Sequence, residues 1–467
     1  MRRFILIVTL AALCVTANAS IKPNALFTDG VVMQRGMPAP VWGTASDGEK
    51  VTVALQGQTV STVAKGGKWM VKLKPLTAGG PLTMTISGEN TIEVKNVLVG
   101  EVWVCAGQSN MGFGLERAAN GPEAVASSKD ANMRLLSVKY TSVETPATDV
   151  NGAWVECGTE TSGNFTAVGY FFGRDLRKAL NVPIGLIDTS VGGTGVQAWM
   201  SKATLEGDPV AAATIKSPLT WVKADRKPYV LYNGMVAPLQ PFAIRGVIWY
   251  QGESNVRAAK AYRTIFPLMI GNWRKDWGQG DFPFLFVQLP GFHMKVTEPQ
   301  ESNWAETREV QLVTSQTCPK TAMAVMADTG EEKNIHPIVK EPAGVRLALA
   351  ARAVAYGEKI VYQGPLYRSL RVSASSAILR FGSVGGGLVA KGGELKGFTI
   401  CGADKKFANA QAEISGDTVV VTSPEVKEPV AVRYGWANFP LGNLFNKEDL
   451  PASPFRTDDL PLPTVIE

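Results

Sequence analysis

The chain has 467 residues, of which 45% are hydrophobic and 19% charged, and its formal net charge is +6. At roughly 100–200 residues per domain this length predicts two to four domains, and the hydrophobic content excludes wholesale disorder. No run of roughly five or six basic residues provides a nucleic-acid arm. We therefore expect neither nucleic acid nor a membrane surface as a partner.

The first nineteen residues (1–19) have the pattern of a secretory signal peptide. Arg2 and Arg3 precede an apolar stretch from Phe4 to Val15, and small residues at Ala17 and Ala19 provide a cleavage site. No later stretch reaches the ~18 apolar residues that span a bilayer. Cleavage near Ala19 predicts a periplasmic or secreted protein without a membrane span.

The cysteines indicate neither a disulfide scaffold nor a zinc site. A lipoprotein acylated at Cys14 is the weaker alternative to the signal peptide, because the bulky Leu13 precedes it. The other cysteines are far apart, form no Cys-x-x-Cys pair and are expected to pack as small buried residues: Cys105, Cys157, Cys318 and Cys401.

Both ends of the mature chain are predicted to be β-rich. Residues 20–97 contain short alternating runs such as "VTVALQGQTVSTV", separated by Gly, Asp and Asn, which is typical of a small antiparallel β-sandwich. Residues 359–467 return to short strands such as "TVVVTS" and "VAVRYGW" and predict a second such domain at the C-terminus.

Residues 98–358 are predicted to form an α/β domain with a parallel sheet. Apolar strands alternate with helix-like stretches, and each strand is followed by a glycine-rich or polar loop. Ligands of such sheets bind beyond the carboxyl ends of the strands. The expected strands are Val102–Ala106, Pro183–Asp188, Gly246–Tyr250, Phe284–Gln288 and Ala322–Met326, the helices Ala167–Leu180, Tyr262–Trp277 and Gly344–Tyr356, and residues 201–228 form an insertion.

Ser109 in "VWVCAGQSNMGFG" directly follows the first of these strands. A serine at this point can be displayed as a nucleophile, but Met111 interrupts the Gly-x-Ser-x-Gly pattern of an α/β-hydrolase. A serine that caps the following helix is the alternative that this stretch alone leaves open.

Two further loops are expected at the same edge of the sheet. "DTSVGGTGVQAW" places Gly192 and Gly193 after the second strand, where a backbone N–H can point into the crevice. "WYQGESN" ends the third strand with polar side chains, which are costly to bury without partners. A polar site is the more economical explanation.

The sequence contains two histidines as candidates for a general base. His293 lies in a loop bounded by Pro and Gly without an acidic neighbour, and is expected to be non-catalytic, at a substrate rim. His336 follows a polar acidic loop and precedes an amphipathic helix, a placement suited to presenting an imidazole. His336 is the better candidate.

The combined motifs resemble the SGNH/GDSL hydrolase superfamily and, within it, the sialate O-acetylesterase family of carbohydrate esterases. The stretches that carry the resemblance occur in order over almost the whole mature chain: "LFTDGVVMQRGMPAPVWGTA", "GEVWVCAGQSNM", "GGTGVQAWM", "LYNGMVAPL", "GVIWYQGESN", "FPFLFVQLP" and "IHPIVK" with "AGVRLALAARA". The resemblance implies a three-layer αβα catalytic domain and hydrolysis of acetyl esters on sugars.

The resemblance also implies roles for individual residues. Ser109 would be the nucleophile and His336 its base, while the N–H groups of Ser109 and Gly193 and the side chain of Gln251 would form the oxyanion hole. The family pattern has Asp where this chain has Asn334, two residues before His336. An amide cannot stabilise the imidazolium by charge, so a substitute acid is sought in Glu332, or in the other nearby acids Asp328, Glu331 and Glu253.

The expected ligand is an O-acetylated carbohydrate, with neither a metal nor an organic cofactor. Candidate substrate-binding residues are Asn110, Trp199, Glu253 and Asn255, and Tyr250, Trp304 and Trp249 are further aromatic candidates, although Trp249 fits core packing equally well. Two alternatives stay open: an esterase for acetylated plant polysaccharide such as xylan, and a carbohydrate-binding protein with weakened catalysis.

Overall fold

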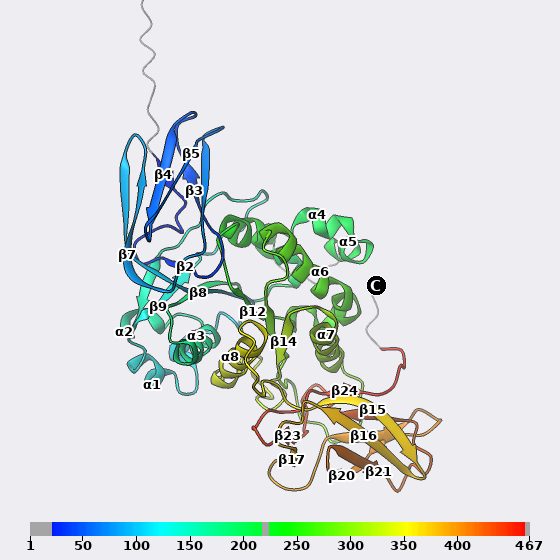
Figure 1. Cartoon of the computed structure of the whole chain (residues 1–467). Coiled ribbons are helices and arrows are strands. Elements are labelled where there is room, and N and C mark those ends of the chain that lie inside the picture. The colour runs from blue at the N-terminus through cyan, green and yellow to red at the C-terminus, as the bar shows by residue number, and fades with distance from the viewer. Residues whose placement is uncertain (1–20, 217–223, 463–467) are drawn as a thin grey trace, which may run out of the picture.

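The computed structural model describes residues 21–216 and 224–462. A central α/β region lies between a β-rich region formed by the N-terminal part of the chain and another formed by the C-terminal part (Figure 1). The expected signal peptide lies outside the described residues. Among the described residues no helix combines the length and the apolar character needed to cross a membrane.

The N-terminal region consists of short strands whose side chains alternate between the core and solvent. In β6, for example, Trp69, Val71 and Leu73 are buried and the residues between them are exposed. The strands are β1 Lys22–Pro23, β2 Val32–Gln34, β3 Ala39–Thr44, β4 Lys50–Leu55, β5 Gln58–Val63, β6 Lys68–Leu73, β7 Gly79–Ser87 and β8 Thr91–Gly107.

Strand β8 joins this region to the central sheet. Its first part pairs with β7 antiparallel, and its last part, from Glu101 to Gly107, pairs with its two central neighbours in parallel. The boundary expected near residue 97 therefore falls inside one continuous strand of 17 residues.

The central sheet has the strand order β10-β9-β11-β8-β12-β13-β14. All of its neighbouring pairs are parallel except β10 with β9, so the predicted parallel α/β sheet is confirmed. The sequence patterns missed β9 and the antiparallel edge strand β10. The bounds are β9 Asp130–Ser137, β10 Trp154–Cys157, β11 Ile184–Ser190, β12 Gly246–Tyr250, β13 Phe284–Val287 and β14 Thr321–Ala324.

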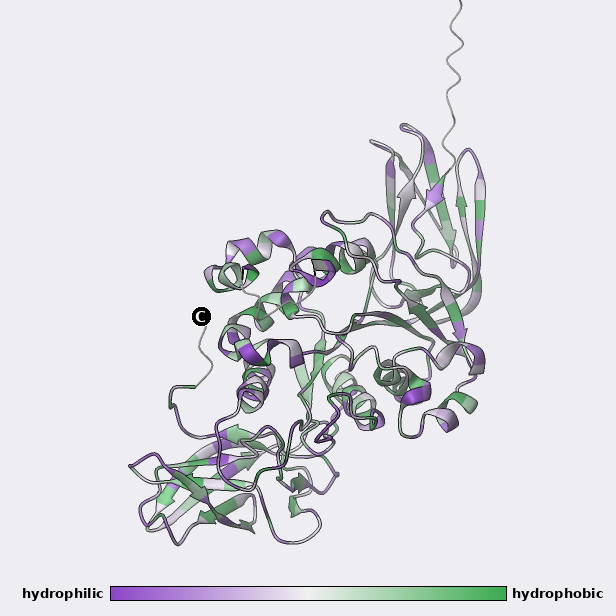
Figure 2. Ribbon diagram, turned by 180° about the vertical axis from the view of Figure 1, so that it is seen from behind, coloured by the Kyte–Doolittle hydropathy of each residue, from purple (hydrophilic) through white to green (hydrophobic). Residues whose placement is uncertain are grey.

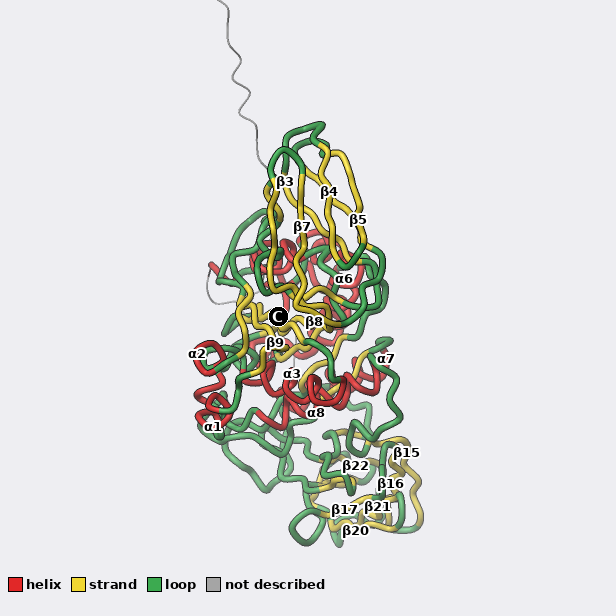
Figure 3. The backbone as a smooth tube through the Cα atoms, turned by 60° about the vertical axis from the view of Figure 1, so that its left-hand side comes forward, coloured by secondary structure: helices red, strands yellow, loops and turns green. Residues whose placement is uncertain are grey.

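Helices cover both faces of this sheet (Figure 3), and the strands between them are strongly hydrophobic (Figure 2). Trp103 and Cys105 of β8 belong to the core layer that contains α3 and α8, whereas Val102 and Val104 belong to the layer that contains α6. The helices are α1 Gly121–Ala126, α2 Thr159–Ser162, α3 Ala167–Leu180, α4 Lys202–Gly207, α5 Pro209–Ile215, α6 Ala259–Trp277, α7 Asn303–Thr317 and α8 Glu341–Val354.

The C-terminal region forms several small sheets, as the sequence predicted. Its strands are β15 Leu366–Ser373, β16 Ser376–Gly382, β17 Leu388–Ala390, β18 Phe398–Cys401, β19 Phe407–Asn409, β20 Gln411–Ser415, β21 Thr418–Thr422, β22 Ala431–Tyr434, β23 Leu444–Asn446 and β24 Phe455–Arg456. The four cysteines of the described chain are unpaired, in agreement with the expectation of no disulfide scaffold.

Arg308 of α7 fastens the C-terminal region to the catalytic region. Its fully buried guanidinium donates to the carbonyls of Leu289 and Pro290 on one side and of Ala437 and Asn438 on the other, at 2.7–2.8 Å. Burial without a carboxylate partner lowers the pKa of Arg308 to about 9. Four carbonyl groups from two regions thus depend on one side chain.

We predict that Arg308→Leu lowers the free energy of unfolding by about 3–5 kcal/mol, because it leaves buried carbonyls without donors. Urea unfolding measures this change, and limited proteolysis should reveal cleavage near Ala437. The matched control is the exposed Arg371, whose replacement by Leu should change stability by less than about 0.5 kcal/mol. Equal stability of the two variants would contradict the anchoring role.

Candidate active site

The nucleophile turn begins where β8 ends, at Gly107. Gly107 has φ +137°, and a Cβ there would lie 2.2 Å from the carbonyl oxygen of Tyr250 in β12. Five residues later, a Cβ on Gly112 would lie 2.6 Å from the hydroxyl of Ser190 in β11. Both glycines are therefore required by close approach of the flanking strands, and the turn between them presents Ser109.

Ser109 and His336 form a hydrogen-bonded pair. The Oγ of Ser109 lies 2.7 Å from Nε2 of His336, although 227 residues separate them in the chain. The alternative of a helix-capping serine is not what the structure has, since the hydroxyl faces the imidazole. This distance allows direct proton transfer between a serine nucleophile and a histidine base.

Asn334 holds the loop of His336 rather than its ring. Its Oδ1 accepts the backbone N–H of His336 at 3.0 Å, and its Nδ2 donates to the carbonyl of His336 at 2.8 Å and to Glu331 at 3.2 Å. The expectation that Asn334 takes the position of the acid beside the imidazole is therefore wrong. The side chain closes a local turn and fixes where the histidine emerges.

The other candidate acids are also engaged away from the imidazole. The Oε1 of Glu332 accepts the backbone N–H of Lys295 at 2.9 Å, so Glu332 is not a substitute acid. Both oxygens of Asp328 pair with Arg346 at 2.7 Å. No described residue forms a hydrogen bond with Nδ1 of His336, so Ser109 and His336 form a dyad.

The electrostatic surroundings of His336 favour its neutral form. Its pKa is lowered from the ordinary value of 6.5 by partial burial, and then by the positive charges of Lys340 and Arg117. A neutral imidazole at pH 7 can accept the proton of Ser109. The same cations disfavour the imidazolium that forms afterwards.

The turn after β11 brings a second free backbone N–H group near the nucleophile. A Cβ on Gly192 would lie 3.1 Å from the Cβ of Ser109, so the turn after β11 packs directly against the serine. Gly193 has φ +68°. The N–H groups of Ser109 and Gly193 donate to no group of the described residues, which leaves both available to an oxyanion.

The side chain of Gln251 is not available as a third donor. Its Nε2 donates to the carbonyl of Thr194 at 3.1 Å and to Oδ1 of Asn255 at 2.7 Å, and its Oε1 accepts from Tyr262. Because both amide protons are committed, the expected oxyanion role of Gln251 is corrected to a structural one. Asn255 is fully buried and also accepts the N–H of Val196, so it ties the two loops together instead of contacting substrate.

Asn110, the residue after the nucleophile, connects a buried lysine to a half-buried glutamate. The Nζ of Lys340 donates to Oδ1 of Asn110, and Nδ2 of Asn110 donates to Glu253, each at 2.5 Å. Burial lowers the pKa of Lys340 to about 7 and raises the pKa of Glu253. Asn110 is itself fully buried, so it positions the turn of Ser109. This differs from the expectation that Asn110 binds substrate.

A hollow of about 440 Å³ opens near the dyad, and its lining includes Ile335, the chain neighbour of His336. Glu253, Trp304 and His293 line it, together with Phe292 and Arg257. The ring of His293 packs on Phe292, with the centroids 4.1 Å apart, which agrees with a rim position and not a catalytic one. Trp304 and Glu253 thus belong to the wall of this hollow, although the indole of Trp304 is largely buried.

Two of the other aromatic candidates lie in the core. Trp199 is fully buried, donates to Thr194 and packs edge-on against Trp249, with the ring centroids 6.1 Å apart. Neither indole can stack on a sugar, because neither reaches the surface, and the expectation for Trp199 was wrong. Tyr250 is likewise buried, beneath the ammonium group of Lys340.

Sequence patterns missed the cations that surround the dyad. Lys340 lies four residues after His336, at the N-terminus of α8. The one local feature that could have drawn attention to it is a positive charge at the end of a helix where the dipole disfavours cations. Arg226 belongs to the insertion of residues 201–228, which carries no recognised motif. Its Nη1 nevertheless lies 2.7 Å from the position that a Cβ on Gly193 would occupy. No cluster of metal-ligating side chains is found within the described residues.

A serine–histidine dyad at the carboxyl edge of a parallel sheet, with two backbone donors beside it, defines a serine esterase of the SGNH hydrolase class. Comparisons with known proteins specify the family. The family described as "Carbohydrate esterase, sialic acid-specific acetylesterase" matches residues 99–337. The chain belongs to this sialate O-acetylesterase family and is a carbohydrate O-acetylesterase.

The relatives agree over most of the chain. The sialate O-acetylesterase of Mus musculus is 32% identical over 91% of this chain and 92% of its own, and that of Homo sapiens is 34% identical over 75% and 74%. A crystal structure of a carbohydrate acetylesterase from Xanthomonas citri matches with a TM-score of 0.88 and 41% identity, and covers 94% of this chain and 100% of that one.

We predict that Arg117→Gln moves the acid limb of the pH profile upward. In the wild type the lowered pKa of His336 places the midpoint of kcat/KM below pH 6.5. Removing one cation favours the imidazolium, so activity at about pH 6 should fall while activity at pH 8 stays constant. The control is Arg371→Gln, which removes an exposed arginine of the C-terminal region that contributes no shift at His336. Identical profiles for Arg117→Gln and the wild type would refute this electrostatic coupling.

We also predict that Asn334→Asp, which restores the usual family residue, does not raise activity. The new carboxylate would face Glu331 and the loop backbone rather than Nδ1 of His336. Like-charge repulsion with Glu331 should instead lower kcat about two- to tenfold. Steady-state kinetics at pH 8 measure the effect, and Glu332→Gln is the neutral control. A tenfold gain for Asn334→Asp would show that this side chain can act on the imidazole.

Proposed function

We propose that this enzyme releases acetate from O-acetylated sugars through an acetyl-enzyme on Ser109. The observation that carries the proposal is the 2.7 Å contact between Oγ of Ser109 and Nε2 of His336. His336 takes the hydroxyl proton as Oγ attacks the acetyl carbonyl. The N–H groups of Ser109 and Gly193 stabilise the oxyanion, the sugar leaves with the proton from His336, and water then releases acetate by the same route in reverse.

The cations near His336 favour the step in which the imidazolium donates its proton to the leaving group. A lowered pKa makes His336 a weaker base, but it makes the imidazolium a stronger acid toward the departing sugar oxygen. No carboxylate is needed to keep the imidazole neutral at pH 7. We infer that the dyad works without the third member that the family pattern suggests.

The sugar is the finer part of the proposal. The names of the curated relatives favour sialic acid as the acetylated residue, whereas the crystal structure from Xanthomonas citri is described as a carbohydrate acetylesterase without a named sugar. An esterase for acetylated plant polysaccharide is the second candidate. Acetate release from O-acetyl sialic acid and from acetyl-xylan distinguishes the two.

We further propose that the enzyme acts outside the cytoplasm, in the periplasm or as a secreted protein. The support is the signal-peptide pattern of residues 1–19, with cleavage near Ala19.

The test of the mechanism is the hydrolysis of 4-nitrophenyl acetate by the wild type and by Ser109→Ala. We expect turnover by Ser109→Ala to fall at least about 10³-fold, because the covalent route is lost. Circular dichroism and thermal unfolding confirm that both proteins are folded. Equal turnover by the two folded proteins would favour the alternative of a carbohydrate-binding protein with weakened catalysis.

A further inference from the structure

Three hollows of the surface adjoin one another at shared lining residues. The hollow near the dyad shares Glu301 with a second hollow of about 180 Å³. The second shares Pro299, Thr399 and Trp436 with a third of about 970 Å³. The long groove, as we call this series, therefore runs from Glu253 at the active site to the C-terminal β region.

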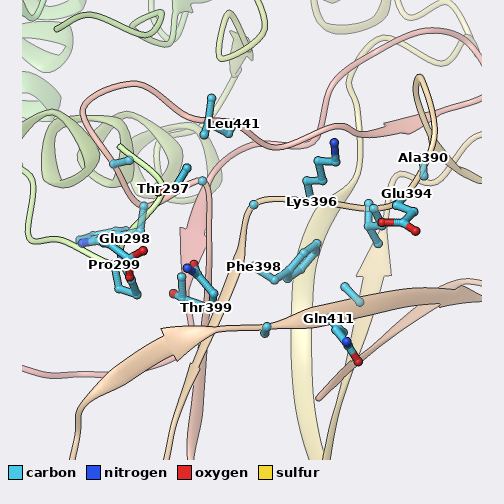
Figure 4. Close-up of a pocket in the computed structure, with 18 of the residues that line it drawn as sticks. Thr297, Glu298, Pro299, Ala390, Glu394, Lys396, Phe398, Thr399, Gln411 and Leu441 are labelled. Atoms are coloured by element: carbon cyan, nitrogen blue, oxygen red, sulfur yellow. The ribbon is translucent and has the colours of Figure 1, made fainter. Parts of the chain in front are cut away.

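The two walls of the long groove come from different parts of the chain. One wall is the connection between β13 and α7, including Glu298 and Pro299, and the other is formed by β18, β20 and residues 435–441. In Figure 4 the labelled side chains from both walls surround a common space, with Phe398 between Glu298 and Gln411.

These walls are fixed to each other by buried charges. Arg308 binds the carbonyls of Ala437 and Asn438 at the groove, and Arg433 pairs with Glu301 at 2.8 Å. The side chain of Arg433 is itself buried. The groove is thus held open by the fold and needs no ligand to form it.

The charges along the third hollow disfavour an anionic ligand. Its lining carries three carboxylates, Glu298, Glu394 and Glu413, against one ammonium group, that of Lys396. Such a surface repels polyanions, including a chain of sialic acids. The lining therefore favours a neutral or cationic occupant over an anionic one.

The remaining lining suits a neutral sugar chain. Asn409, Gln411, Thr297 and Thr399 add amide and hydroxyl groups, which can bind sugar hydroxyls as donors and acceptors. The side chains of Gln411 and Glu413 make no hydrogen bond within the described part of the chain. Apolar surface from the exposed side chain of Leu441 can receive the C–H face of a sugar ring, whereas Phe398 is buried and only underlies this surface.

We propose that the long groove binds a neutral oligosaccharide chain that extends from the acetylated sugar at Ser109. This proposal rests on the proposed function and makes it more specific, because the substrate becomes an acetylated neutral polysaccharide rather than a free sialic acid. The C-terminal region then forms part of the substrate site. The catalytic motifs do not indicate this role, because none of them lies in that region.

The binding test uses the full-length Ser109→Ala protein, so that no ester is cleaved. Isothermal titration calorimetry with xylohexaose, cellohexaose, xylose and a sialic acid hexamer should give binding of at least one neutral hexasaccharide and none of xylose or the sialic acid hexamer. Adding Gln411→Ala and Glu413→Gln should weaken that binding about tenfold, as the loss of two ordinary hydrogen bonds implies. The matched control is Glu428→Gln, an exposed glutamate of the same region outside the groove.

The kinetic test uses the active enzyme with the same substitutions. Gln411→Ala/Glu413→Gln should raise KM on acetyl-xylan or another acetylated polysaccharide and leave the hydrolysis of 4-nitrophenyl acetate unchanged. Binding of the sialic acid hexamer alone, no binding of either neutral hexasaccharide, or equal binding by the groove and control variants would overturn the proposal. An inactive wild type whose Ser109→Ala form still binds the hexasaccharide would instead refute the esterase mechanism and leave the groove intact.

Discussion

The parallel register of three adjacent strands is the constraint on which the active site depends. Ser190 of β11 and Tyr250 of β12 both lie opposite Gly107 of β8, so the three strands end at the same level. Their loops must then share one edge of the sheet, and this brings the serine turn, the glycine turn and the Gln251 loop together. The strands approach so closely at Gly107 that a side chain there would collide with the backbone of β12.

The polar groups around the dyad form two layers with different tasks. One layer contains Ser109, His336 and the two free N–H groups, which the proposed mechanism assigns to the reacting ester. The other layer contains Asn110, Gln251 and Asn255, whose hydrogen bonds are all internal and whose work is to hold the loops in place. A polar side chain in such a motif can therefore support the loops instead of contacting the substrate, and the partner of each atom distinguishes the two roles.

The base in the proposed mechanism is a histidine among cations rather than one beside a carboxylate. Together with partial burial, Lys340 and Arg117 lower the pKa of His336. The lowered pKa favours the neutral imidazole and makes the imidazolium a stronger acid. Lys340 itself is buried, bonded to Asn110 and attracted by Glu253, so the charge that tunes the histidine also fixes the nucleophile turn. One lysine thus couples the position of Ser109 to the protonation of its base.

The sequence by itself determined the β, α/β, β order of the chain, the positions of the main strands and helices, and the pair Ser109 and His336, because periodicity, glycine placement and short motifs act locally. It also indicated the glycine turn at Gly193. Only the tertiary structure decided the partners of the individual side chains. Asn334 binds the backbone of its own loop, Gln251 binds neighbouring loop residues, and Trp199 packs in the core. The tertiary structure also brought Lys340 to the dyad and the C-terminal strands to the long groove. Those partners lie up to hundreds of residues apart, and side-chain direction and burial, which choose between them, are fixed only when the separate elements pack.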